Sequence, residues 1–312
     1  MSDARVVGVR PWFPWPLSRW NWWNEPIPAE RVAALRVAAA LALLIDIGFG
    51  YLPHFTAFFG PDAVSAHLYD GRFRAGHAHW SVLRVLPEAW GARVLFGIWI
   101  GSAVALLVGW RPLVSGLLAW ACAMSVWTFN PGLHNGGDRI RQLLLLVTAV
   151  SCSGTVWAVS SVRDEADPRP IWVPGWPVKL LFVQLAALYF FSGYYKALSP
   201  IWRSGYVMYW VSHDLGWSLC PGAADRVPVW AQRLSALVTL LWELGFPVLA
   251  VLRLTRAPTL VLGVLFHLGT LLTLEVGAFA LYSIACYAAF APWERLRGIG
   301  PQGADATPEP AR

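Results

Sequence analysis

The chain is short of charged residues. Only 13% of its 312 residues are Asp, Glu, Lys or Arg, whereas 57% are apolar and the mean hydropathy is +0.50. Charged residues make up about a quarter of an ordinary soluble domain, so this composition excludes that class. We therefore expect a protein whose main partner is a lipid bilayer.

Lysine is nearly absent. The chain has 22 Arg but only two Lys, Lys179 and Lys196. The net charge of +6 is compatible with nucleic-acid binding, yet the arginines stand at the ends of apolar runs and form no basic stripe. They indicate topology signals, and we expect no nucleic-acid partner. Because arginine is the default basic residue, the lysine in FFSGYYKALSPIWRSGY, residues 190–206, needs an explanation.

Cysteine and metal-ligand patterns are equally scarce. Three of the four cysteines lie in apolar runs and Cys220 has no obvious partner, so the cysteines say little about the fold. His134 and Asp138 have the i, i+4 spacing of a metal pair, but two intervening glycines argue against a regular helix there. His77 and His79 lack a third ligand. We expect no bound metal.

What the chain does have is long apolar segments. About eight of them approach the ~20 residues that cross a hydrocarbon core as a helix. None shows the alternation of a transmembrane barrel strand, so we predict an all-α, polytopic membrane helix bundle. The last two segments are separated by little more than EVGAF and form either a hairpin or one broken span. The expected segments are 32–52, 91–109, 112–133, 140–160, 177–198, 234–252, 257–275 and 276–292.

The basic residues predict the orientation. With the N-terminus inside, 14 of the 24 Lys and Arg residues fall on the cytoplasmic side. The short turns around Arg111 and around Arg253 and Arg256 decide it, because the positive-inside bias is strongest in short connections. The preference for arginine, with abundant Ala, Gly and Pro, indicates a GC-rich bacterial genome. We expect a multi-pass cell-membrane protein with both termini cytoplasmic and two long loops outside, 53–90 and 199–233.

The two ends differ from the middle of the chain. Residues 1–29 hold five tryptophans among prolines and arginines between residues 10 and 28, as in an interfacial anchor, and lack the apolar core of a cleavable signal peptide. Residues 298–312 are polar and predicted to be disordered. The transmembrane domain is then expected at 30–297.

Polar residues inside the expected spans are candidate functional positions, because ionisable groups in hydrocarbon are costly and face a partner or a cavity. Asp46 is expected to pair with an arginine such as Arg139 or Arg141, and Gln184 is expected to join helices. The other such positions are His134, Asn135, Asp138, Lys196, Glu243, His267 and Glu275.

Two interpretations of Lys196 stay open. A cation near a helix C-terminus complements the helix dipole, and its long stem can reach the membrane interface. Alternatively, Ser192 and Gly193 lie one turn earlier on the same face and leave room beside the amine, and SPIW then ends the helix. Such a desolvated pocket would favour the neutral amine, which could act as a base. Arginine could not, because it stays protonated.

Five blocks carry a family resemblance. LRVAAALALLIDIGFG resembles a first helix with Leu-Asp-Ile, FNPGLHNGGD stands in the place of an Asn-Asn-His segment, and ALYFFSGYYKALSPIWRSGYVMYW resembles a block around a lysine. WELGFPVLA and FHLGTLLTLEVGAFALYSIACYAAFAPWERL resemble the last helices. In this order they resemble the horizontally transferred transmembrane (HTTM) domain, the membrane half of vitamin K-dependent gamma-carboxylase. Compact bacterial members include a branch similar to sporulation-delaying protein B.

The resemblance implies a chemistry. In the carboxylase, a lysine of this block deprotonates vitamin K hydroquinone, O2 converts the product to a strongly basic alkoxide, and that base removes a glutamate γ-proton before CO2 adds. Lys196 would be the base and His134 its assistant. The cofactor would be reduced vitamin K or menaquinol, without a metal. The residues expected to contact the quinol are His267, Asn135, Tyr189, Tyr195 and Trp202.

Two functions from different classes follow. One is a quinol- and O2-dependent membrane enzyme that carboxylates or otherwise modifies an exported peptide. The alternative is a non-catalytic membrane subunit for maturation or export of a secreted peptide. After the helices, the carboxylase carries a large lumenal domain that recognises the propeptide, and we expect no counterpart of it in residues 298–312. The resemblance therefore does not identify the protein substrate.

Overall fold

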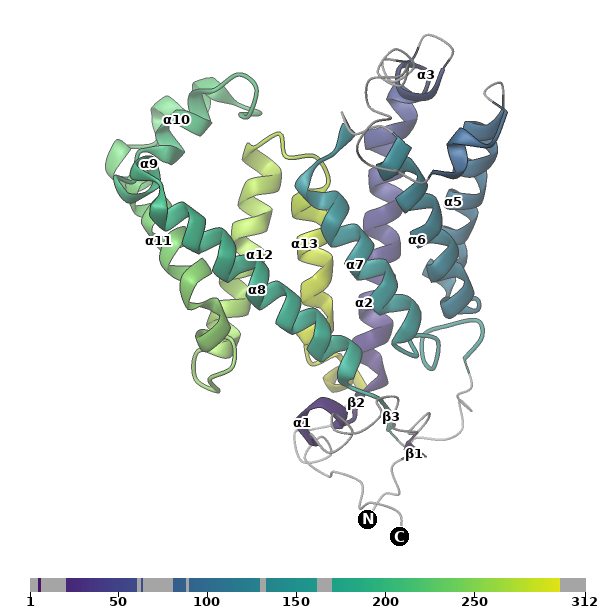
Figure 1. Cartoon of the computed structure of the whole chain (residues 1–312). Coiled ribbons are helices and arrows are strands. Elements are labelled where there is room, and N and C mark those ends of the chain that lie inside the picture. Colours follow the sequence, from purple (N-terminus) through teal and green to yellow (C-terminus); the bar gives the residue numbers. More distant parts are fainter. Residues whose placement is uncertain are drawn as a thin grey trace.

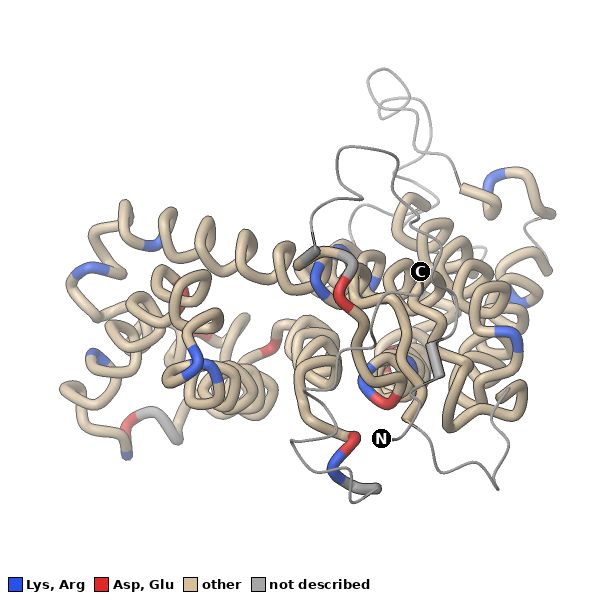
Figure 2. The backbone as a smooth tube through the Cα atoms, turned by 90° about the horizontal axis from the view of Figure 1, so that it is seen from below, with Lys and Arg blue, Asp and Glu red and all other residues tan. Residues whose placement is uncertain are grey.

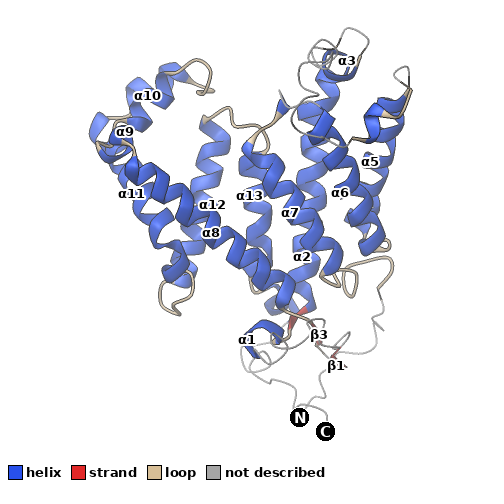
Figure 3. Cartoon of the chain, viewed as in Figure 1, coloured by secondary structure: helices blue, strands red, loops and turns tan. Residues whose placement is uncertain are grey.

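The computed structural model describes residues 5–6, 21–60, 63, 81–87, 90–129, 133–161 and 170–297. Most of the expected N-terminal anchor and the whole polar tail, 298–312, lie outside these ranges. Within them the protein is almost entirely helical (Figure 3), and strands are confined to a small sheet. The predicted all-α class is confirmed, because that sheet is made of three very short strands: β1 Arg5–Val6, β2 Ile27–Pro28 and β3 Ile171–Val173.

Eight longer helices form the bundle (Figure 1), and each overlaps one of the expected apolar segments. Their bounds are α2 Ala29–Ile45, α5 Gly91–Val108, α6 Pro112–Phe129, α7 Gly136–Val150, α8 Trp176–Leu198, α11 Val229–Leu249, α12 Arg256–Thr273 and α13 Phe279–Tyr287. The shorter helices are α1 Asn21–Asn24, which precedes α2, and α3 Phe55–Phe59, α9 Pro200–Arg203 and α10 Val207–His213, which lie between longer ones.

The structure does not confirm a count of eight membrane spans. In the described part of the chain, five helices are long and apolar enough to cross a membrane. These are the continuous α2–α3 unit, Ala29–Phe59, together with α5, α6, α8 and α12. α7 has 15 residues and α13 has nine, which is short of the ~20 that a span needs. α11 has 21 residues, but Arg233 and Glu243 interrupt its apolar sequence. α12 and α13 are separate helices, joined through residues 274–278.

The helix surfaces are consistent with a bilayer. Large apolar side chains are exposed along several helices, including Leu241 at 69% and Leu265 at 57%. Others are Ile98, Leu117 and Val261, on α5, α6 and α12. Exposed apolar faces of this size have no reason to form in water, so they indicate lipid contact.

Two features tie the bundle together at the end that carries the small sheet, called here the sheet end. Arg31 Nη2 lies 2.5 Å from Glu294 Oε1, which joins the start of α2 to the 3-10 turn Trp293–Arg297. Arg36 is fully buried and donates to the carbonyl oxygens of Ser153 and Trp157 after α7.

Viewed from below, Lys and Arg are spread over separate elements (Figure 2). We call the opposite end the α10 end.

The start of α7 corrects one expectation. Gly136 and Gly137 argued against a helix, yet α7 begins at Gly136. Asn135 accepts from the Gly137 N–H and Asp138 accepts from the Asn135 N–H, so a capping box starts the helix. Glycine is required by packing, because a Cβ on Gly137 would lie 2.7 Å from the backbone nitrogen of Phe279 on α13.

Candidate functional site

Lys196 lies in the last turn of α8, which ends before Pro200. Its Nζ atom is 2.5 Å from Oε1 of Glu243 on α11. The two helices approach closely because α8 has glycine at position 193. A Cβ there would lie 3.0 Å from both the Glu243 Cβ and the Leu244 backbone nitrogen. Gly193 therefore allows the ion pair. It lies one turn before Lys196 on α8 and faces the part of α11 that carries Glu243.

The surroundings of the pair are largely dry. The Glu243 side chain is 3% exposed and that of Lys196 is 21% exposed. The indole of Trp202, on α9, lies with its ring centroid 4.6 Å from Nζ, a cation–π geometry. The structure thus adds a carboxylate that the sequence interpretation of Lys196 lacked.

A second polar group joins α8 to α12 and α13. His267 on α12 is fully buried, and its Nε2 is 2.7 Å from the hydroxyl of Tyr189 on α8. Tyr287 on α13 donates to the Tyr189 hydroxyl over 3.0 Å. Because Tyr189 accepts from Tyr287, its own proton is directed at Nε2 of His267. Within the described residues Nδ1 of His267 has no hydrogen-bond partner, which is costly for a buried polar atom.

Aromatic packing connects this chain of hydroxyls to the ion pair. The ring of Tyr189 lies 4.7 Å from Trp242 and 4.6 Å from Phe246, measured between centroids. Trp242 directly precedes Glu243 on α11. The two groups therefore share the α8–α11 interface, which the sequence could not reveal.

The aromatic residues before Lys196 do not form one pocket. Tyr189 is 1% exposed, whereas Tyr195 is 69% exposed. The helical period explains the difference, because positions 189, 193 and 196 share the face toward α11. The aromatic residues on the other face are exposed: Phe190, Phe191, Tyr194 and Tyr195. Tyr195 is thus separated from Tyr189, with which it was expected to contact the quinol.

His134 and Asn135 have local partners. His134 Nε2 lies 2.5 Å from the carbonyl oxygen of Trp127, and the two rings stack at 5.1 Å. Asn135 caps α7. The start of α7 lies beside α13, whereas the end of α8 lies beside α9 and α11 (Figure 1). No contact between described residues joins His134 to Lys196.

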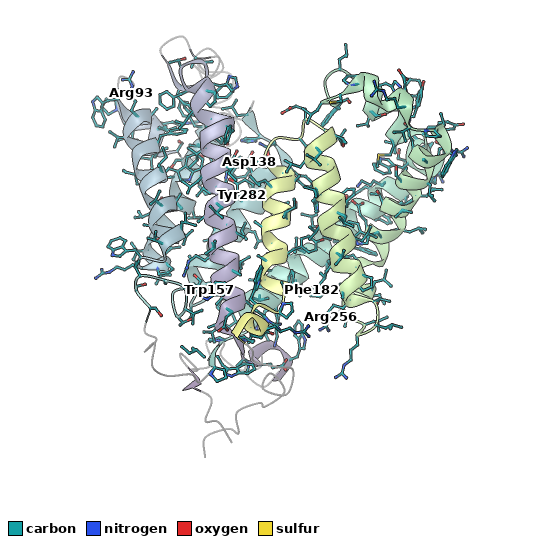
Figure 4. All side chains as sticks on the ribbon, turned by 180° about the vertical axis from the view of Figure 1, so that it is seen from behind. Arg93, Asp138, Trp157, Phe182, Arg256 and Tyr282 are labelled. Carbon is teal, nitrogen blue, oxygen red and sulfur yellow. The ribbon has the colours of Figure 1, made fainter. Side chains whose placement is uncertain are left out.

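Asp46 and Arg141 form a buried ion pair, as expected, with 2.8 Å between Oδ2 and Nη1. Tyr282 also donates to that Oδ2 over 2.6 Å, and Arg141 Nη2 lies 2.7 Å from Asp138 Oδ1. Asp138 and Tyr282 lie close together in the upper part of the bundle, beside α2 and α13 (Figure 4). The Asp138 carboxylate therefore contacts Arg141 and the backbone N–H of Asn135, and it makes no metal pair with His134.

A cleft opens beside this network at the α10 end. Its volume is about 450 Å³, and its walls include Asp46, Asn135 and Glu275. Asp46 begins a π-helical turn, Asp46–Tyr51, in which α2 departs from regular geometry. Such turns occur often at functional sites. The two glycines of DIGFGY are only a weak sequence signal for this turn.

Metal ligands do not gather in the described ranges, where no three His, Cys, Asp or Glu side chains come together. His77 and His79 lie outside those ranges. Glu243 is the site residue that sequence reasoning missed, since it was expected only as a polar position within a span and was given no role. Its signal was an acidic residue inside the apolar run around WELGF.

Comparison with known protein families identifies the domain to which most of the chain corresponds. The model of the HTTM domain matches residues 24–294, which is most of the chain. No curated protein and no solved structure matches it. The apolar helices and the domain match agree, and the chain belongs to the HTTM domain family.

Proposed function

We propose that this protein is a quinol-dependent membrane enzyme whose base is the Lys196–Glu243 pair. The observation that carries the proposal is the contact of a mostly buried amine with a buried carboxylate and an indole, beside the hydroxyl chain of Tyr189. Ionisable groups placed at this cost inside a bundle mark functional sites by default.

The pair can act as a base when the proton that the two groups share resides on the Glu243 carboxyl group. Nζ of Lys196 is then a neutral amine. A quinol hydroxyl has the acidity of a phenol, with a pKa of about 10, which matches an alkyl amine. Nζ would take the hydroxyl proton, and the Glu243 carboxyl would stay hydrogen-bonded to it. Arginine at 196 would keep the charge but could not accept a proton.

The remaining residues fit a ligand with polar ring substituents. His267 has a buried Nδ1 without a described partner, so a ligand hydroxyl or carbonyl that reached it would satisfy a polar atom. The rings of Trp202 and Tyr189 would hold a flat aromatic body. Reduced vitamin K or menaquinol supplies, with O2, a base strong enough to remove a carbon-bound proton. We infer that an exported peptide receives the modification.

The test uses both lysines of the chain. Purified protein is incubated with reduced menaquinone or vitamin K under O2, and the epoxide is measured. Lys196→Ala and Lys196→Arg should each abolish epoxide formation. Lys179→Arg is the matched control and should retain it, because Lys179 lies at the other end of α8 and pairs with Glu25. Epoxide formation by Lys196→Arg would exclude the amine as the base.

The same ion pair favours one alternative. A Lys196–Glu243 contact fastens α8 to α11, which a non-catalytic subunit for maturation or export of a secreted peptide would also need. In that case Lys196→Arg is silent in peptide maturation, because arginine preserves the pair. The two proposals therefore predict opposite results for one substitution.

A further inference from the structure

The buried network around Arg141 sets two carboxyl groups against one guanidinium. Asp46 and Asp138 have side chains 7% and 2% exposed, and both contact Arg141, which is 1% exposed. Among the residues that the structure describes, no second cation pairs with either carboxylate. A charge in such a place is stable only when it is compensated.

The carboxyl oxygen that lacks a hydrogen-bond partner among the described residues belongs to Asp46. Asp138 uses Oδ1 for Arg141 and Oδ2 for the cap of α7. Asp46 directs Oδ2 at both Arg141 and Tyr282. Its Oδ1 has no hydrogen bond to the described part of the chain, although the residue is only 8% exposed and lines the cleft.

Glycine keeps this oxygen accessible. A Cβ added to Gly50, one turn later in the π-helical segment, would lie 3.0 Å from Asp46 Oδ1. The neighbouring Gly48 has nothing within 4 Å of such an atom. A side chain introduced at position 50 would therefore hinder approach to the carboxylate, whereas one introduced at position 48 would not.

The rest of the cleft suits a cation on an apolar stem. Glu275 is an exposed second carboxylate on its wall, and Asn135 adds an amide. Most other lining residues are apolar, among them Phe49, Leu271 and Leu281. A phospholipid ammonium fits poorly, because its neighbouring phosphate would meet the same carboxylates. A lysine side chain fits, since four methylene groups separate its ammonium from the peptide.

We propose that this cleft binds a lysine side chain of a peptide, flanked by apolar residues, with its ammonium between Asp46 Oδ1 and Glu275. The site is separate from the Lys196–Glu243 pair. It goes beyond the proposed quinol chemistry, because binding needs neither quinol nor O2.

The test measures peptide binding to the full-length protein in detergent, with fluorescence anisotropy as the readout. The probe is a labelled seven-residue peptide with blocked ends and one central lysine between leucine and alanine residues. A second peptide carries norleucine in its place, which keeps the stem and removes the charge. The lysine peptide should bind at least tenfold more tightly, as expected for a charged hydrogen bond.

Two pairs of variants locate the site. Gly50→Ala should weaken binding of the lysine peptide about tenfold, whereas Gly48→Ala should leave it unchanged. Glu275→Gln should weaken it, whereas Glu25→Gln, at the sheet end, should not. Thermal unfolding of each variant shows whether the fold is kept, and the norleucine peptide should bind all four alike.

Several results would overturn the inference. One is equal binding of the lysine and norleucine peptides to the unaltered protein. Another is equal binding of the lysine peptide to Gly50→Ala and Gly48→Ala. Displacement of the peptide by phosphatidylethanolamine vesicles, but not by phosphatidylglycerol vesicles, would assign the cleft to a lipid headgroup and also contradict the proposal.

Discussion

The Nζ atom of Lys196 lies 2.5 Å from Oε1 of Glu243, and this contact joins two helices that are 30 residues apart along the chain at their nearest ends. Gly193 sets the distance between the two backbones. The pair is thus a product of close helix packing as much as of charge. Each of these three residues can be tested separately.

Glu243→Gln should impair catalysis more than folding. The amide keeps the size of the carboxyl group and can still accept a hydrogen bond from Lys196, but it cannot exchange a proton with it. We expect epoxide formation to fall at least tenfold, with only a small shift in the Tm. Glu25→Gln is the control, because Glu25 is exposed at the sheet end and outside the ion pair. Full activity of Glu243→Gln would remove the carboxyl group from the mechanism.

Gly193→Ala should separate α8 from α11. The new methyl group would meet the Leu244 backbone at 3.0 Å, so a helix must move. Overpacking of this kind costs about 1–3 kcal/mol, and it should lengthen the Lys196–Glu243 contact. Gly269→Ala on α12 is the matched control, since nothing lies within 4 Å of a Cβ there. Thermal unfolding and the epoxide assay measure both effects, and equal behaviour of the two variants would contradict the role of Gly193.

Arg141→Met should be among the most destabilising substitutions. It would leave Asp46 and Asp138 buried without a cation, which costs about 3–5 kcal/mol. Arg139→Met provides the comparison, because Arg139 is exposed on the same turn of α7. The measurement is the Tm in detergent. A loss of Tm no larger than that of Arg139→Met would show that the network does not depend on its arginine.

The native cysteines offer a test of orientation. Cys152 and Cys220 are exposed, at the sheet end and the α10 end respectively, whereas Cys122 and Cys286 are buried. If the termini are cytoplasmic, a membrane-impermeant maleimide should label Cys220 in intact cells and Cys152 only after permeabilisation. Cys220→Ser and Cys152→Ser identify the two signals. Labelling of Cys152 in intact cells would reverse the orientation inferred from the arginines.

The sequence was most informative where one local property sufficed. Apolar length located a helix in each expected segment, and the cost of a charge in hydrocarbon predicted that Asp46 pairs with an arginine, found to be Arg141. It was less informative about span number, because apolar composition does not reveal where a helix ends. α7 has 15 residues and α13 has nine, so both are shorter than the apolar segments expected at 140–160 and 276–292.

Contacts between distant residues could not be read from the chain. His134 and Lys196 both stood out as polar residues in apolar surroundings, yet His134 binds the Trp127 carbonyl and Lys196 binds Glu243. The exposed position of Tyr195 and the burial of Tyr189 likewise depend on which face of α8 meets α11.

By itself, then, the sequence determined a membrane-embedded helical protein and the residues for which hydrocarbon is costly, because both depend on composition within a single segment. Only the tertiary structure decided how those residues pair. Two glycines, at 193 and 137, permit close helix contacts at Glu243 and Phe279. The partner of each polar group depends on the separation of different helices, in which shifts of a few tenths of an ångström matter.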